Sequence, residues 1–132
     1  MVAFDTNIFI YVLQDHNEFG RHAAACLRAA GAQGTASELV YAELLGHQSL
    51  QTERHRVIAQ AFLDDQPFNF RPIDRHILID AAKLRAHHTP LIGLGDAIHL
   101  ATAMSVRADT FMTNDKHLAR CTVPGLKIEL LQ

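Results

Sequence analysis

The chain has 132 residues, of which 48% are hydrophobic and 20% charged, and these proportions are typical of one ordinary globular domain spanning residues 1–132. No apolar run approaches the roughly 20 residues of a membrane-spanning helix, and the start lacks a basic region followed by an apolar core, so we expect neither a membrane segment nor a secretory signal. Cys26 and Cys121 show no metal-binding or disulfide spacing, which favours a cytoplasmic location, and the formal net charge of −2 argues against a generally basic nucleic-acid-binding protein.

Short apolar runs predict buried strands, and longer segments with apolar residues at helical spacing predict helices. The expected strands are Val2 to Phe4, Gly34 to Ser37 (a strand or a loop), Phe68 to Ile73, Asp109 to Thr113 and Leu126 to Leu131. The expected helices are one capped by Thr6 or Asn7 and ending near Gln14, Glu18 to Ala30, Glu38 to Gly46, Gln51 to Asp65, one capped by Asp74 and ending near His88, Asp96 to about Val106, and Asp115 to Ala119.

The connections between these elements decide the fold class. Thr89 and Pro90 should end the fifth helix, and Gly93 to Gly95 should form a flexible loop before the sixth. Helices separate the strands, and no tight hairpin joins two of them, which indicates a parallel sheet covered on both faces. The sequence therefore predicts an α/β fold, a three-layer α/β/α sandwich around a mostly parallel sheet.

Four acidic residues lie at element junctions or in apolar surroundings. Asp5 follows the first strand and Asp115 follows the fourth, and ligands bind at the carboxyl ends of strands in open α/β sheets. Asp96 opens a helix that is apolar nearly all round, and Glu43 lies in the apolar run of its own helix. Taken singly, each acid is also explained by helix capping, by the helix dipole or by a salt bridge.

Gathered in one crevice, the four carboxylates would repel one another, and a bound divalent cation would remove that repulsion. Carboxylates without histidine or cysteine ligands favour Mg²⁺ or Mn²⁺ over zinc. Such a centre suits phosphodiester hydrolysis, because a metal ion neutralises a phosphate oxygen and lowers the pKa of a bound water. The histidines and cysteines show no zinc spacing, and Gly93 with Gly95 does not make a phosphate-binding loop.

These residues resemble the PIN domain family and, within it, the VapC-type toxins of toxin–antitoxin systems. The matching segments occur in the family's order over essentially the whole chain: Phe4-Asp5-Thr6-Asn7, Glu43-Leu44-Leu45-Gly46, Gly95 to Ala103, and Phe111 to Asp115. The resemblance implies a Mg²⁺- or Mn²⁺-dependent endoribonuclease that cuts structured RNA such as tRNA or rRNA. It also implies a homodimer and a cognate antitoxin that masks the site.

By this resemblance the acidic, metal-binding and catalytic residues are Asp5, Glu43, Asp96 and Asp115, with Asp5 and Asp96 as the direct metal ligands. The residues that would orient the carboxylates or contact phosphate are Thr6, Asn7, Thr113 and Asn114. His99 follows Asp96 by three residues on the same helical face and would lie near the site, as a core residue or beside the acids.

Two other functions are compatible with parts of the pattern. A PIN-like module could bind RNA or protein without significant turnover, although the complete set of four acids argues against that. A small phosphohydrolase could use Asp5 as a covalent nucleophile, but such enzymes need a second acid two residues later, and position 7 is Asn. Candidate basic patches for RNA, which are also ordinary surface charges, are Arg21 with Arg28, Arg54 to Arg56, Arg71 with Arg75, and Lys116-His117.

Overall fold

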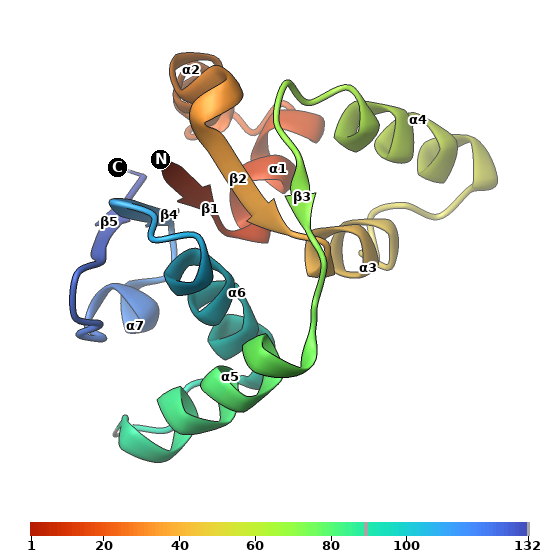
Figure 1. Cartoon of the computed structure of the whole chain (residues 1–132). Helices are drawn as coiled ribbons and strands as arrows, with labels where there is room; N and C mark the ends of the chain where they lie inside the picture. Colours follow the sequence, from red (N-terminus) through yellow and green to blue (C-terminus); the bar gives the residue numbers. More distant parts are fainter. Residues whose placement is uncertain (89, 132) are drawn as a thin grey trace.

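A parallel five-stranded sheet forms the centre of the molecule, and the computed structural model describes it within residues 1–88 and 90–131. The strands are β1 (Val2–Phe4), β2 (Gly34–Ser37), β3 (Phe70–Arg71), β4 (Thr110–Thr113) and β5 (Lys127–Leu130). Their order is β3-β2-β1-β4-β5, and neighbouring strands pair in parallel (Figure 1). The first strand of the sequence therefore lies at the middle of the sheet, between β2 and β4.

Helices cover both faces of the sheet, which confirms the predicted α/β/α sandwich. The helices of the first half of the chain are α1 (Thr6–Leu13), α2 (Gly20–Ala30), α3 (Leu39–Leu45) and α4 (Glu53–Asp64). Those of the second half are α5 (Arg75–His87), α6 (Leu94–Ser105) and α7 (Lys116–Ala119). None of the helices within the described ranges is both long and apolar enough to cross a bilayer.

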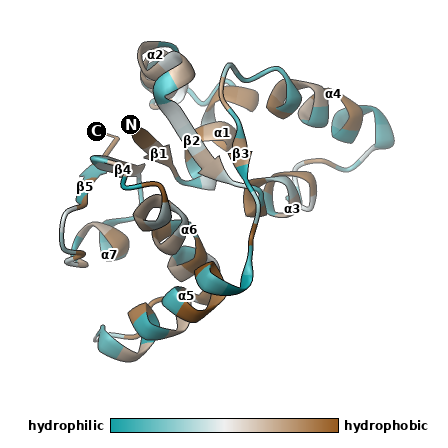
Figure 2. Cartoon of the chain, viewed as in Figure 1, coloured by the Kyte–Doolittle hydropathy of each residue, from teal (hydrophilic) through white to brown (hydrophobic). Residues whose placement is uncertain are grey.

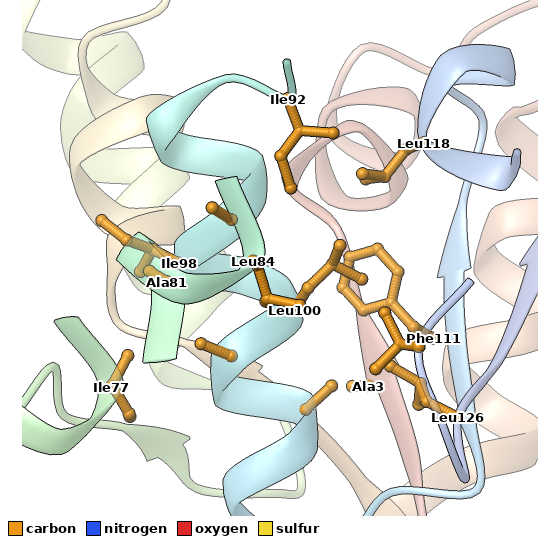
Figure 3. Close-up of a cluster of buried hydrophobic side chains, with 14 of the residues drawn as sticks. Ala3, Ile77, Ala81, Leu84, Ile92, Ile98, Leu100, Phe111, Leu118 and Leu126 are labelled. Carbon is orange, nitrogen blue, oxygen red and sulfur yellow. The ribbon is translucent and has the colours of Figure 1, made fainter. Parts of the chain in front are cut away.

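Two hydrophobic clusters fill the space between the sheet and its helices. Successive strand residues point to opposite faces, so Ala3 packs in the cluster under α5 and α6, with Leu100 and Phe111 (Figure 3). Phe4 instead joins the cluster under the helices of the first half, where it packs edge-on against Phe9. Figure 2 shows strongly hydrophobic colour on β1 and hydrophilic stretches on the outlying α4 and α5. The sheet is buried on both sides, as its short apolar strands require.

Two predicted helix starts near the acids were wrong. The N-cap of α1 is Asp5 itself, rather than Thr6 or Asn7: Asp5 is extended, and its carboxylate accepts a hydrogen bond from the Thr6 N–H. The residues from Gly93 to Gly95 are not a loop throughout, because α6 begins at Leu94 and Gly93 is its N-cap. The Ala97 N–H donates to the Gly93 carbonyl at 3.0 Å, so Asp96 lies inside the first helical turn.

Other boundaries moved by a few residues. The helix α2 begins at Gly20, because the His16 ring accepts hydrogen bonds from two backbone N–H groups of the preceding turn. The strand β3 is confined to Phe70–Arg71, since Pro72 has no N–H to donate to a neighbouring strand. The expected end of α5 at Thr89 lies outside the described residues, and His87 is the last residue of that helix.

Candidate acidic site

Asp5 is buried at the carboxyl end of the central strand. One carboxylate oxygen, Oδ1, accepts from the Thr6 N–H at 2.7 Å, and the other, Oδ2, accepts from the Thr113 hydroxyl at 2.7 Å. The Thr113 oxygen in turn accepts from the Asp115 N–H at 3.1 Å. These bonds follow from the parallel pairing of β1 with β4, which places the residues after both strands side by side. Burial raises the pKa of Asp5, although His99 and the hydrogen bonds from Thr113 and Thr6 act in the opposite direction.

Glu43 reaches the same edge from α3 and is held by two side chains. Its Oε1 accepts from the Thr6 hydroxyl at 2.6 Å and lies 2.5 Å from His99 Nε2. His99 projects from α6 with only 2% of its surface exposed, and its Nε2 is also 3.8 Å from Asp5 Oδ1. Glu43 and His99 thus form a hydrogen-bonded ion pair beneath the acidic cluster.

The protonation of this pair follows from its surroundings. Burial acts to raise the pKa of Glu43, but the hydrogen bonds from His99 and Thr6 outweigh it and lower the pKa. Burial likewise acts to lower the pKa of His99, but the hydrogen bond to Glu43 and the charge of Asp5 raise it. Both shifts act in the direction that favours a carboxylate on Glu43 and a protonated imidazole on His99.

Asp96 and Asp115 complete the acidic cluster. Asp96 lies half-buried in the first turn of α6, and its pKa is raised to about 6 by burial and by the negative charges of Asp5, Asp115 and Glu43, while His99 lowers it. Asp115 is the N-cap of α7, where its Oδ1 accepts from the His117 N–H at 2.8 Å. The negative charges of Asp5, Asp115 and Glu43 thus act on Asp96, and the assignment of the four acids as a metal-binding and catalytic site stays a prediction.

The donor set suits a hard divalent cation. Carboxylate oxygens are the ligands that Mg²⁺ and Mn²⁺ prefer, and a cation would remove the repulsion that now favours the protonated form of Asp96. Within residues 1–88 and 90–131, however, no three carboxylate, imidazole or thiol groups already surround a common point at coordination distance. Side chains would therefore have to move inward around an ion.

The polar residues predicted around the acids divide into two groups. Thr6 and Thr113 contact carboxylates directly, and the Asn7 amide lies 3.4 Å from the Thr113 hydroxyl. The Asn114 amide instead donates to the Tyr11 hydroxyl at 3.1 Å, so it contacts a side chain of α1 rather than an acid.

Gly95 contributes to the site, although the sequence analysis gave it no role there and named it only in the expected loop and in a segment that resembles the family. A Cβ atom at position 95 would lie 3.1 Å from Glu43 Oε2 and 3.8 Å from a methyl carbon of Leu39. The glycine therefore lets α6 approach α3 closely enough for the Glu43–His99 pair to form. The one signal in the sequence was a residue of low helix propensity next to the acid that begins the predicted helix.

Comparison with known proteins identifies this fold. A chain of a toxin–antitoxin complex from Klebsiella pneumoniae is 27% identical, with a TM-score of 0.71 over 96% of this chain and 95% of that chain. A chain of DNA-bound VapBC from Salmonella typhimurium is 23% identical, with a TM-score of 0.77 over 99% of this chain and 98% of that chain. A chain of FitAcB from Neisseria gonorrhoeae is 21% identical, with a TM-score of 0.69 over 89% and 90%.

The last two likenesses show the fold alone, and no curated protein sequence matches this chain. A family model of the PIN domain, in contrast, matches residues 2–123. This match includes all four acids and every strand except β5. The resemblance seen in the sequence is thus confirmed, and the chain belongs to the PIN domain family.

Proposed function

We propose that this protein is a Mg²⁺- or Mn²⁺-dependent endoribonuclease, a VapC-like toxin that hydrolyses phosphodiester bonds in structured RNA such as tRNA or rRNA. The observation that supports the proposal is that Asp96 is near enough to Asp5, Asp115 and Glu43 for their charges to raise its pKa, while His99 contacts Glu43 and lies 3.8 Å from Asp5. Mutual repulsion makes this arrangement unfavourable for stability, so a functional requirement for the charge is the better explanation.

Each acid has a distinct place in the proposed site. Asp5 and Asp96 would bind the cation directly, with Asp115 and Glu43 completing its surroundings. A bound divalent cation would neutralise a phosphate oxygen and lower the pKa of a water molecule. Thr113 fixes one oxygen of Asp5 by a hydrogen bond, which limits the positions that this carboxylate can adopt.

We propose that His99 is a positioning residue, because its ring is buried and contacts Glu43 from the protein interior. A His99→Gln variant keeps an N–H donor for Glu43, whereas His99→Leu keeps only the bulk. We expect the glutamine variant to recover much of the metal-dependent cleavage that the leucine variant loses. If circular dichroism shows that both variants are folded and the two cleave RNA equally well, His99 does not position Glu43.

The deciding experiment is cleavage of a mixed tRNA and rRNA pool with Mn²⁺, with Mg²⁺ and with EDTA. Wild type is compared with Asp96→Asn and with Asp65→Asn, a matched change at an exposed acid beyond the end of α4. We expect discrete fragments that require both metal and Asp96, with Asp65→Asn as active as wild type. Metal-independent cleavage, or an active Asp96→Asn protein, would refute the site.

A binding module without turnover is the alternative, and it predicts RNA retention with no fragments under any metal condition. An antitoxin partner is supported by the relatives, since one is described as a toxin–antitoxin complex and another as VapBC. We propose that a small cognate antitoxin covers the acids and that the toxin acts in the cytoplasm as a homodimer. Co-purification with the product of an adjacent small gene, and light scattering of the free protein, test these two assemblies.

A further inference from the structure

A cavity of about 400 Å³ opens beside the acidic site. One wall is the connection between α5 and α6, and the other is α7 with the residues that follow it. Asp96 and Asp115 line the edge that the cavity shares with the acidic cluster. Its volume is within the range of sites that bind small molecules, so it is large enough for one nucleoside.

Part of the cavity wall is apolar. Ile92 and Leu118 are buried and lie at the same end of the hydrophobic cluster shown in Figure 3, one before α6 and one in α7. Leu91, beside them, has 64% of its surface exposed, which is high for a leucine. An exposed aliphatic side chain on the rim of an apolar cavity offers a flat, uncharged group such as a nucleobase a favourable contact.

A positive charge also lies at this cavity. Arg120 lines it, directly after the short helix α7 that contains Lys116. Both residues are exposed, in a chain whose formal net charge is −2. Such a cation would attract a phosphate that the carboxylates of Asp96 and Asp115 repel.

The order of the strands places the cavity on one particular side of Asp5. Since β1 lies between β2 and β4, Glu43 approaches Asp5 from the side of β2. Asp115 follows β4 and leads into α7, so the cavity lies on the opposite side of Asp5. RNA whose scissile phosphate lay over Asp5 and Asp96 would therefore place a neighbouring nucleotide at the cavity on one side of the cut.

We propose that this cavity binds one unpaired nucleotide adjacent to the scissile phosphate, with its base against Leu91 and Leu118 and its outer phosphate near Arg120. The inference rests on the proposed ribonuclease function and adds the recognition of one base to it. The nucleotide must be unpaired because a base stacked in a duplex cannot enter the cavity without leaving its neighbours.

The test is cleavage of a randomised single-stranded RNA pool with Mn²⁺, followed by sequencing of the fragment ends. Leu91→Ala and Arg120→Ala are compared with two controls remote from the cavity. These are Val57→Ala, at a residue 59% exposed on α4, and Lys127→Ala, at an exposed residue at the start of β5. Loss of the apolar contact between Leu91 and a base is expected to change a rate or affinity by about fivefold.

We expect wild type to prefer particular bases at one position next to the cut, and Leu91→Ala to weaken that preference. Arg120→Ala should raise KM by about fivefold with little change in kcat, because a phosphate contact remote from the cut is present in both the ground state and the transition state. The two control variants should match wild type. Cleavage without a base preference, or with the same preference and KM in every variant, would overturn the proposal.

If neither this pool nor the tRNA and rRNA pool is cut, the proposed function fails, and the cavity is then tested by binding alone. Fluorescence anisotropy of a labelled single-stranded RNA pool gives the affinity in EDTA. Weaker binding by Leu91→Ala and Arg120→Ala than by the controls, and weaker binding of a stable RNA duplex than of single strands, would support the cavity. Equal binding by all variants, or no binding, would refute it.

Discussion

Replacing Asp96 with asparagine should make the metal-free protein more stable at neutral pH. The pKa of Asp96 is raised from 3.8 to about 6 by burial and by the charges of Asp5 and Asp115. Between these two values the folded protein holds a proton that the unfolded chain releases. The free energy of unfolding therefore falls as the pH rises through this window, and the whole penalty is present above about pH 6. Asparagine keeps the shape of the side chain and does not ionise.

The size of the effect follows from the pKa shift and the exposure of the group. A shift of this size is equivalent to about 3 kcal/mol if it is fully expressed. Asp96 is only half-buried, so solvent screening reduces the expected penalty to about 1–2 kcal/mol. The variant also loses the favourable interaction of an acid with the first turn of α6, which is about 0.3–1 kcal/mol. The net gain for Asp96→Asn above pH 6 is then about 1 kcal/mol.

The assay is urea unfolding of both proteins in EDTA from about pH 4 to about pH 8, the window set by the two pKa values. The stability of the variant relative to wild type should be lowest near pH 4 and rise by about 1–2 kcal/mol towards neutrality. Asp65→Asn, at an exposed acid, should show no such rise. Adding Mn²⁺ should stabilise wild type more than Asp96→Asn. A difference independent of pH in EDTA would show that the acids are not electrostatically coupled.

Two further changes test the close approach of α6 to α3 and the packing of α6. Gly95→Ala should reduce metal-dependent cleavage while leaving the melting temperature unchanged or higher, because the new Cβ displaces Glu43 but suits a helix. Leu94→Ala, at a residue 55% exposed in the same helical turn, is the control, and full activity of Gly95→Ala would contradict this account. Leu100→Ala should lower the free energy of unfolding by about 2–5 kcal/mol, because Leu100 is fully buried. Leu94→Ala, at a residue 55% exposed on the same helix, should change that free energy little. Urea unfolding measures both effects. Similar losses in both leucine variants would refute the assignment of α6 to the core.

Much of the fold could be predicted because its signals are local. Runs such as Val2 to Phe4 are too short and too apolar for surface helices, and the intervening helices leave room only for parallel crossovers. The errors occurred where a local preference competes with a tertiary contact. Gly95 has low helix propensity, yet it lies inside α6, where an added Cβ would be only 3.1 Å from Glu43 Oε2. Asp5 caps α1 because the preceding strand ends at Phe4.

The sequence by itself determined the types of the elements, their parallel arrangement and the placement of Asp5 and Asp115 at strand ends, since each depends on neighbours along the chain. Tertiary structure alone decided the strand order that puts Glu43 and Asp115 on opposite sides of Asp5. It also decided the contacts of Glu43 with Thr6, 37 residues away, and of Thr113 with Asp5, 108 residues away. Such contacts are set by packing two clusters against one sheet and by the cost of burying unpaired charge. Both are properties of the whole fold, which no local pattern encodes.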